Sequence, residues 1–158
     1  MNDEHRMQQL IAYTREMNEE PYAASIFNEG GEMLAQAIGN KQSPINHVEI
    51  LAINLCAVQH PDIDWQTLTL YTTGEPCCMC AAACCWANLK AVVYATDISF
   101  MTKLWGIEGS LRAREVINAH PKQPLLIESV CREAGDALFK KFEQAFAQTW
   151  EEKRWKLT

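Results

Sequence analysis

Five of the seven cysteines in this chain crowd into nine residues, and this cluster constrains the fold more than any other feature. They are Cys77, Cys78, Cys80, Cys84 and Cys85. Such crowding indicates a metal site in a reducing compartment rather than a disulfide framework. Pro76 suits the first turn of a helix, predicted over residues 76–88, so Cys77 and Cys80 are expected to place their sulfur atoms on one face of it.

A Cys-x-x-Cys pair at the start of a helix is compatible with three kinds of site. Cys77 and Cys80 can share a catalytic zinc ion with a ligand from elsewhere in the chain. The same spacing after a strand is typical of thioredoxin-like redox proteins, in which the helix dipole lowers the pKa of a thiol. It is equally half of a structural zinc site. The pair alone leaves all three interpretations open.

A second motif, His47-Val48-Glu49, lies thirty residues upstream, at the start of another predicted helix over residues 47–60. His-x-Glu followed by Pro-Cys-x-x-Cys is the signature of zinc-dependent nucleobase deaminases. On these residues the chain resembles the cytidine deaminase-like superfamily. The resemblance implies a hydrolytic deaminase in which His47, Cys77 and Cys80 hold one zinc ion.

The spacing of these residues is consistent with catalysis at a metal. His47 and Glu49 sit about 200° apart on a regular helix and can meet at one metal only near its first turn. Two helix N-termini are therefore expected to face each other across the zinc. Three protein ligands leave the fourth position to water, whose pKa the metal lowers from about 15.7 toward ~7. Glu49 is then expected to take a proton from this water and pass it to a ring nitrogen and to departing ammonia.

The rest of the chain alternates between helical and strand patterns. Predicted helices cover residues 3–18, 47–60, 76–88, 110–119 and a closing stretch from about 133. Predicted strands cover residues 23–27, 33–38, 68–72, 91–95 and 125–130, and residues 96–109 are expected to form a loop. This alternation predicts one layered α/β domain over residues 1–158. The resemblance implies a three-layer αβα sandwich around a mixed sheet of about five strands.

Within the predicted helix over residues 47–60, apolar side chains recur at helical spacing. They are Ile50, Leu51, Leu55 and Val58.

The charge of the chain favours small substrates. Twenty acidic residues stand against fourteen basic ones, for a net charge of −6. Binding of a polyanion depends on clustered Lys and Arg, so nucleic acid is not an expected partner. No apolar run approaches the ~20 residues that a membrane span requires. We therefore expect a soluble, cytoplasmic protein without a membrane partner.

Between about residues 21 and 108 the resemblance is to the small bacterial guanine deaminases. Pro21-Tyr22-Ala23-Ala24 is similar to their Pro-aromatic-Gly-Ala segment. The resemblance implies that Asn40 binds the base, that Trp86 lines the pocket with Tyr22, and that Glu108 is a second acidic residue assisting proton transfer. It implies conversion of guanine to xanthine and ammonia.

Ala23, Asn46 and Val48 depart from the pattern of those enzymes. Val48 still offers a backbone N–H toward a carbonyl oxygen of the base. Its side chain is larger than the usual alanine, which leaves related amino-triazines or pterins open as substrates.

Other functions remain open from the sequence. Transfer RNA adenosine deaminases share the Asn, His, Glu and Cys positions, but they carry a Lys-Thr-Gly-rich stretch where residues 97–105 stand here. Cytidine and cytosine deaminases fit less well in two segments: the predicted strand pair over residues 23–27 and 33–38, and the predicted loop over residues 96–109. Outside the deaminases, a Cys-x-x-Cys redox protein and a zinc-stabilised binding module without turnover are the alternatives.

A homodimer is expected from the dimeric habit of the resembled family and from a C-terminal end rich in aromatic residues. These are Phe142, Phe146, Trp150 and Trp155.

Overall fold

The structure is a computed structural model that describes residues 2–17, 20–39, 43–106 and 109–144. Asn40, Glu108 and the aromatic residues Phe146, Trp150 and Trp155 lie outside the described residues. Among the described residues, no helix combines the length and the apolar character needed to cross a membrane.

Five strands in the described residues form one mixed sheet in the order β2-β1-β3-β4-β5. The strands are β1 (Ala23–Phe27), β2 (Met33–Ile38), β3 (Thr69–Gly74), β4 (Ala91–Thr96) and β5 (Leu125–Ile127). β1 runs antiparallel to both β2 and β3. β3, β4 and β5 are parallel. The predicted mixed, five-stranded sheet is confirmed.

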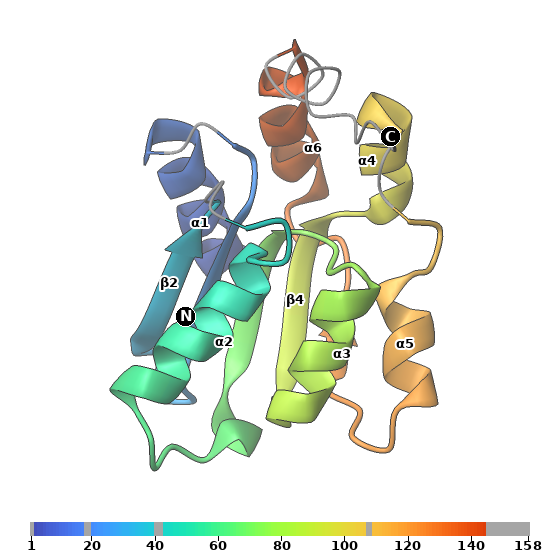
Figure 1. The fold of residues 1–158 in the computed structure, drawn as a ribbon. Helices are drawn as coiled ribbons and strands as arrows, with labels where there is room; N and C mark the ends of the chain where they lie inside the picture. Colours follow the sequence, from blue (N-terminus) through green and yellow to red (C-terminus); the bar gives the residue numbers. More distant parts are fainter. Residues whose placement is uncertain (1, 18–19, 40–42, 107–108, 145–158) are drawn as a thin grey trace.

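Helices cover both faces of this sheet (Figure 1). In the described residues they are α1 (Asp3–Met17), α2 (Val48–Gln59), α3 (Cys78–Ala87), α4 (Ile98–Trp105), α5 (Ala113–Ala119) and α6 (Arg132–Lys141). α2 packs on β1 and β2, with α3 and α5 beside it on the same face. α1 and α6 pack on β3 and β4 from the opposite face. The result is a three-layer αβα sandwich.

Alternating side chains on the central strands supply the two cores. Leu70 and Val92 join the core under α2 and α3. Their neighbours Tyr71 and Val93 join the core under α1 and α6. Successive side chains of a strand point to opposite faces, so a buried central strand contributes to both layers.

The segment that follows β4 is helical, and the predicted loop over residues 96–109 is wrong in this respect. Asp97 caps α4 by accepting a hydrogen bond from the backbone N–H of Phe100 at 2.8 Å. Ile98 and Met101 bury one side of the helix. Gly106 ends it with a φ of +70°, which glycine adopts without strain. Asp at the cap, apolar residues three apart and a closing glycine are sequence signals that could have identified α4.

The buried side of α2 also differs from the apolar repeat in its sequence. Val48, Ala52 and Cys56, four residues apart, face the sheet. Leu55 and Val58 are 38% and 80% exposed. The small side chains let the helix lie close to Ala24 and Ala35 of the sheet. Close packing of the helix backbone on the sheet therefore decides which side of α2 is buried, more than the size of its apolar side chains.

One edge of the sheet collects the ends of several elements. β2 ends beside the start of β1, where Ile38 pairs with Ala23. β3 and β4 end at the same edge, where Gly74 pairs with Thr96. α3 and α4 begin directly after these strands. Side chains from segments far apart in sequence are therefore brought together at this edge.

Candidate active site

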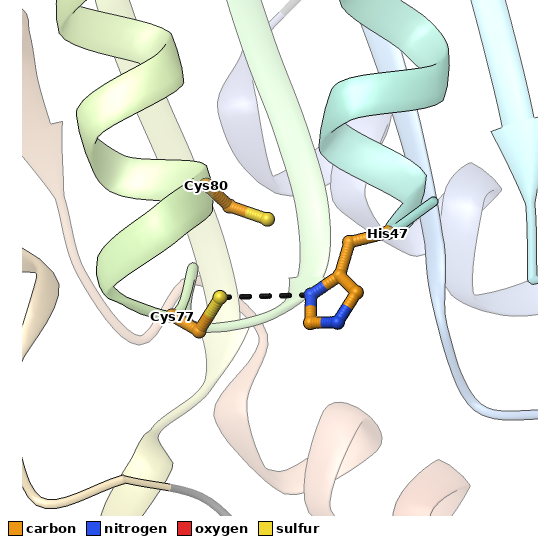
Figure 2. A group of neighbouring side chains, drawn as sticks. All are labelled: His47, Cys77 and Cys80. Atoms are coloured by element: carbon orange, nitrogen blue, oxygen red, sulfur yellow. Dashed lines mark hydrogen bonds between the residues drawn. The ribbon is translucent and has the colours of Figure 1, made fainter. Parts of the chain in front are cut away.

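His47 stands at the start of α2. It is the N-cap residue, with an extended backbone (φ −65°, ψ 153°) instead of a helical one. Because the chain turns into the helix only after this residue, its imidazole projects beyond the helix end, toward α3 (Figure 2). Glu49 lies in the first turn of the same helix. The helix start is therefore where both polar side chains can reach one site.

Cys77 and Cys80 stand at the start of α3. Cys77 is its N-cap residue, again with an extended backbone, and Cys80 is buried in the first turn. One ligand atom from each of His47, Cys77 and Cys80 lies within 4.8 Å of the others. Figure 2 shows the two sulfur atoms and the imidazole facing a common point between the helix ends. The two helix N-termini thus face each other across the cluster.

The distance between the Cys77 and His47 ligand atoms matches that expected in a tetrahedral zinc site. Zinc binds sulfur at about 2.3 Å and nitrogen at about 2.05 Å, so tetrahedral S and N ligands lie about 3.6 Å apart. The Sγ atom of Cys77 and the Nδ1 atom of His47 are 3.5 Å apart. One imidazole and two thiols are also a donor set that suits zinc. The residues present therefore suit a zinc ion.

The two thiols differ in acidity in the absence of a metal. A hydrogen bond from Cys80 lowers the pKa of Cys77 to about 4, and the nearby His47 acts in the same direction. The same hydrogen bond, together with burial, raises the pKa of Cys80. The surroundings of Cys77 thus favour the thiolate, the form in which cysteine binds metals.

Glu49 is buried beside this cluster, with 5% of its surface exposed. Burial is the largest cause of its raised pKa, and contacts with its own backbone, His47 and Cys80 lower the pKa by less. The Thr72 hydroxyl donates a hydrogen bond to its Oε1 atom over 3.1 Å. A carboxyl group with a raised pKa next to a metal set is suited to exchanging protons.

Val48 contributes its side chain to the core rather than to a pocket. It is 2% exposed and packs in the cluster under α2. Its backbone N–H belongs to the first turn of the helix, where N–H groups have no intrahelical acceptor.

The two aromatic residues expected at the pocket lie in different places. Tyr22, half-buried directly before β1, packs edge-on against Phe139 at 5.3 Å between ring centroids and lies 6.4 Å from Trp105 of α4. Trp86 is 70% exposed, with its ring against His120. Nine residues of helix separate it from Cys77, about 13 Å along the axis. Within one chain Trp86 is therefore remote from the cluster, at the far end of α3.

Trp105 is the aromatic neighbour of Tyr22 that sequence reasoning missed. Its ring lies 5.6 Å from that of Phe139. Because residues 96–109 were expected to form a loop, no helical position was assigned to it. The apolar spacing of Ile98, Met101 and Trp105 is the signal that points to it.

Glu75, which is buried, and Arg112, which is partly exposed, form an ion pair next to the cysteines that sequence reasoning also missed. The Arg112 Nη2 atom lies 2.8 Å from Glu75 Oε2. Glu75 also accepts hydrogen bonds from the backbone N–H groups of Ile98 and Ala113, each at 2.9 Å. This one carboxylate therefore ties the starts of α4 and α5 to the segment that leads into Pro76 and Cys77.

Comparisons with known proteins agree with this geometry. Residues 1–120 match the sequence model described as MafB19-like deaminase. The tRNA-specific adenosine deaminase subunit tad2 of Schizosaccharomyces pombe is 33% identical over 87 residues, 53% of this chain and 22% of that protein. Guanine deaminase of Bacillus subtilis is 34% identical over 80 residues, 49% of this chain and 51% of that enzyme. The chain thus spans about a fifth and about half of the length of these two relatives.

A solved structure of guanine deaminase from Nitrosomonas europaea superimposes with a TM-score of 0.78 at 21% identity, covering 90% of this chain and 85% of that one. This likeness shows the shared fold. The predicted resemblance to the cytidine deaminase-like superfamily is confirmed, and with it the expected enzyme class, a hydrolytic deaminase.

Proposed function

Since the chain belongs to the MafB19-like deaminase family, we propose that it catalyses the zinc-dependent hydrolytic deamination of a free nucleobase, guanine to xanthine and ammonia. One observation carries this proposal. The ligand atoms of His47, Cys77 and Cys80 converge within 4.8 Å, and the buried carboxylate of Glu49 lies beside them. A metal set next to an acid–base group is what hydrolysis of a C–N bond requires.

The roles follow from the chemistry of each group. Zinc, when bound at this cluster, lowers the pKa of the attacking water. Glu49 accepts the proton that this water loses and delivers it to the ring nitrogen beside the carbon under attack. It then carries the remaining hydroxyl proton to the amino group, which leaves as ammonia. Guanine and one water thus give xanthine and one ammonia. We assign to the backbone N–H of Val48 a hydrogen bond to a carbonyl oxygen of the base.

Tyr22, Asn40 and Glu108 complete the proposed site. Tyr22 supplies an aromatic surface for a planar ring, supported by its packing on Phe139 and near Trp105. Asn40 reads the edge of the base through its amide, and Glu108 assists proton transfer at the amino group. The resemblance to guanine deaminases supports both assignments. The expected pocket role of Trp86 has no support within a single chain, because its side chain lies far along α3 from the cluster.

Charge favours a free base over a polynucleotide. A polynucleotide deaminase must hold several phosphates with Lys and Arg. This chain carries a net charge of −6. A free base has no phosphate backbone, so its binding depends on stacking and on hydrogen bonds to its edges.

Adenosine in transfer RNA is the second candidate substrate, supported by the 33% identity to the tad2 subunit. Cytosine and cytidine are further candidates. Ammonia release from guanine, adenine, cytosine, cytidine and ammeline should be measured beside inosine formation in transfer RNA. We expect turnover of guanine and no inosine. Efficient transfer RNA editing without guanine turnover would overturn the substrate assignment.

The same assay, combined with metal analysis, separates the deaminase from the other two classes. A Cys-x-x-Cys redox protein would carry no stoichiometric zinc and would form a reducible Cys77–Cys80 disulfide. A zinc-stabilised binding module would carry zinc but release ammonia from none of these bases. Both thiols are free in the structure.

We also propose that the chain forms a homodimer. Phe142, one of the aromatic residues on which the expectation rested, is 8% exposed and belongs to the core under α1 and α6. Support now comes from large apolar side chains exposed on helices of the opposite layer, among them Val58 of α2 and Trp86 of α3. A light-scattering mass of one chain at micromolar concentration would refute the dimer.

A further inference from the structure

We infer that Thr72, on the central strand β3, is a positioning residue that orients the carboxylate of Glu49; this inference rests on the deaminase function proposed above. The Thr72 hydroxyl donates a hydrogen bond to Glu49 Oε1 over 3.1 Å. Thr72 is fully buried and Glu49 is 5% exposed. Twenty-three residues separate them in sequence, so the contact is made by the packing of α2 on the sheet.

Thr72 lies on the face of β3 that packs against an apolar core, where a hydroxyl group is unusual. Leu70, two residues earlier and on the same face, belongs to the apolar core under α2 and α3. A hydroxyl buried without a hydrogen bond costs about 1 to 3 kcal/mol, so packing alone would favour valine at position 72. The hydroxyl of Thr72 is used in the contact with Glu49.

The backbone N–H of Glu49 hydrogen-bonds to the carboxylate, but a second partner is needed to fix the plane of this group. The start of α2 holds the backbone of Glu49, but the last torsion of a glutamate side chain is broad and has no sharp preferred angle. A hydrogen bond to Oε1 sets the plane of the carboxylate. The direction of Oε2 is then set as well, which matters for a group that must exchange protons with two partners in turn.

Thr72 is itself held firmly. β3 lies between β1 and β4, and Thr72 pairs with Ala24 on one side and with Tyr94 on the other. A residue in the middle of a sheet moves little relative to its neighbours, so its hydroxyl offers a fixed reference for the carboxylate.

The Cys80 thiol also lies near the Glu49 carboxylate and lowers its pKa. A cysteine that binds zinc does so as the thiolate and has no proton left to donate. Of the side chains of Thr72 and Cys80, only Thr72 keeps its proton with the metal bound. Thr72 is therefore the side-chain donor that remains to orient Glu49 in the loaded enzyme, beside the backbone N–H of Glu49.

The test compares two valine variants of neighbouring threonines. Thr72→Val keeps the shape of the side chain and removes its hydroxyl. Thr73→Val is the matched control, since Thr73 is equally buried on the same strand but donates to the backbone oxygen of Pro21 at 2.7 Å. Thr72→Ser restores the hydroxyl without the methyl group. Zinc content, melting temperature, kcat and KM are measured for each, with wild type and Glu49→Gln as references.

We expect Thr72→Val to keep its zinc and to lose kcat by about tenfold to a hundredfold, with KM changed by less than about threefold. Thr72→Ser should recover most of the lost kcat. Thr73→Val should lower the melting temperature while its kcat stays within about threefold of wild type.

An unchanged kcat in Thr72→Val, or a loss in Thr72→Ser as large as in Thr72→Val, would overturn the positioning role. Loss of zinc in Thr72→Val would show a structural role and overturn it as well. These outcomes differ from failure of the proposed function, in which wild type itself releases no ammonia from any base and both proposals fall.

Discussion

Arg112 and Glu75 meet side by side, with the Nε atom of Arg112 at 2.9 Å from both carboxylate oxygens of Glu75. The carboxylate is buried and the guanidinium is 35% exposed. The contact raises the pKa of Arg112, chiefly through the hydrogen bonds to Glu75. With the backbone N–H groups of Ile98 and Ala113 also donating to it, Glu75 joins three segments around the cysteine cluster.

Replacement of Glu75 by glutamine should destabilise the protein by about 2 kcal/mol. The amide nitrogen of glutamine would be a donor placed against donors, and Arg112 would lose its counter-charge. For a chain of this length the melting temperature should fall by about 4 to 8 °C. Glu29→Gln is the control, because Glu29 pairs with Lys90 at the surface and should contribute less than about 1 kcal/mol. Equal melting temperatures for the two variants would contradict the anchoring role.

Alanine at His47, Cys77 or Cys80 should abolish zinc binding. We expect about one zinc ion per chain in the wild type and a small fraction of that in each variant, together with most of the folding stability lost, because the ligands tie α2 to α3. Metal analysis after dialysis and thermal unfolding measure both effects. Cys78→Ala, which changes the exposed cysteine between the ligands, should keep its zinc. Full retention of metal in Cys80→Ala would point instead to Cys84, one turn further along α3.

Glu49→Gln should separate catalysis from metal binding. Glutamine keeps the size of the side chain but cannot carry protons, so kcat should fall by about 10² to 10⁴. Zinc content should not change, because Glu49 is not among the three proposed ligands. Turnover close to wild type in a zinc-loaded variant would exclude the proposed proton transfer.

Glu108→Gln should reduce guanine turnover by about 10² or more and leave the melting temperature within about 2 °C of wild type. A proton carrier affects the barrier of the reaction, whereas the stability of the fold does not depend on it. Asn40→Ala should differ by raising KM as well, since an amide that reads the base is used in substrate binding too. Unchanged kinetics in Glu108→Gln would leave this residue without a role in proton transfer.

Local pattern was sufficient for most of the secondary structure. β1 and β2 lie where strands were predicted, over residues 23–27 and 33–38. α3 was predicted over residues 76–88 with Pro76 in its first turn; it spans Cys78–Ala87, so Pro76 lies just before the helix and Cys77 is its N-cap. Spacing of three or four residues along one helix, or of two along one strand, is a property of neighbours in sequence, so the sequence can display it directly.

The pairing of His47 with Cys77 was predictable for a different reason. Nothing local connects residues thirty apart, and the expectation came from a motif that resembles a known superfamily. The structure adds the geometric basis, because both residues are N-caps with extended backbones that project their side chains past the helix ends.

Only the tertiary structure decided which of several suitable side chains meet. Four apolar residues recur along α2, yet the small Val48, Ala52 and Cys56 face the sheet. Tyr22 meets Trp105 rather than Trp86, Glu75 meets Arg112, and Thr72 meets Glu49. Each choice depends on how closely a helix approaches the sheet and on where each strand ends. Those quantities are set by packing of the whole domain, and no single segment of the sequence contains them.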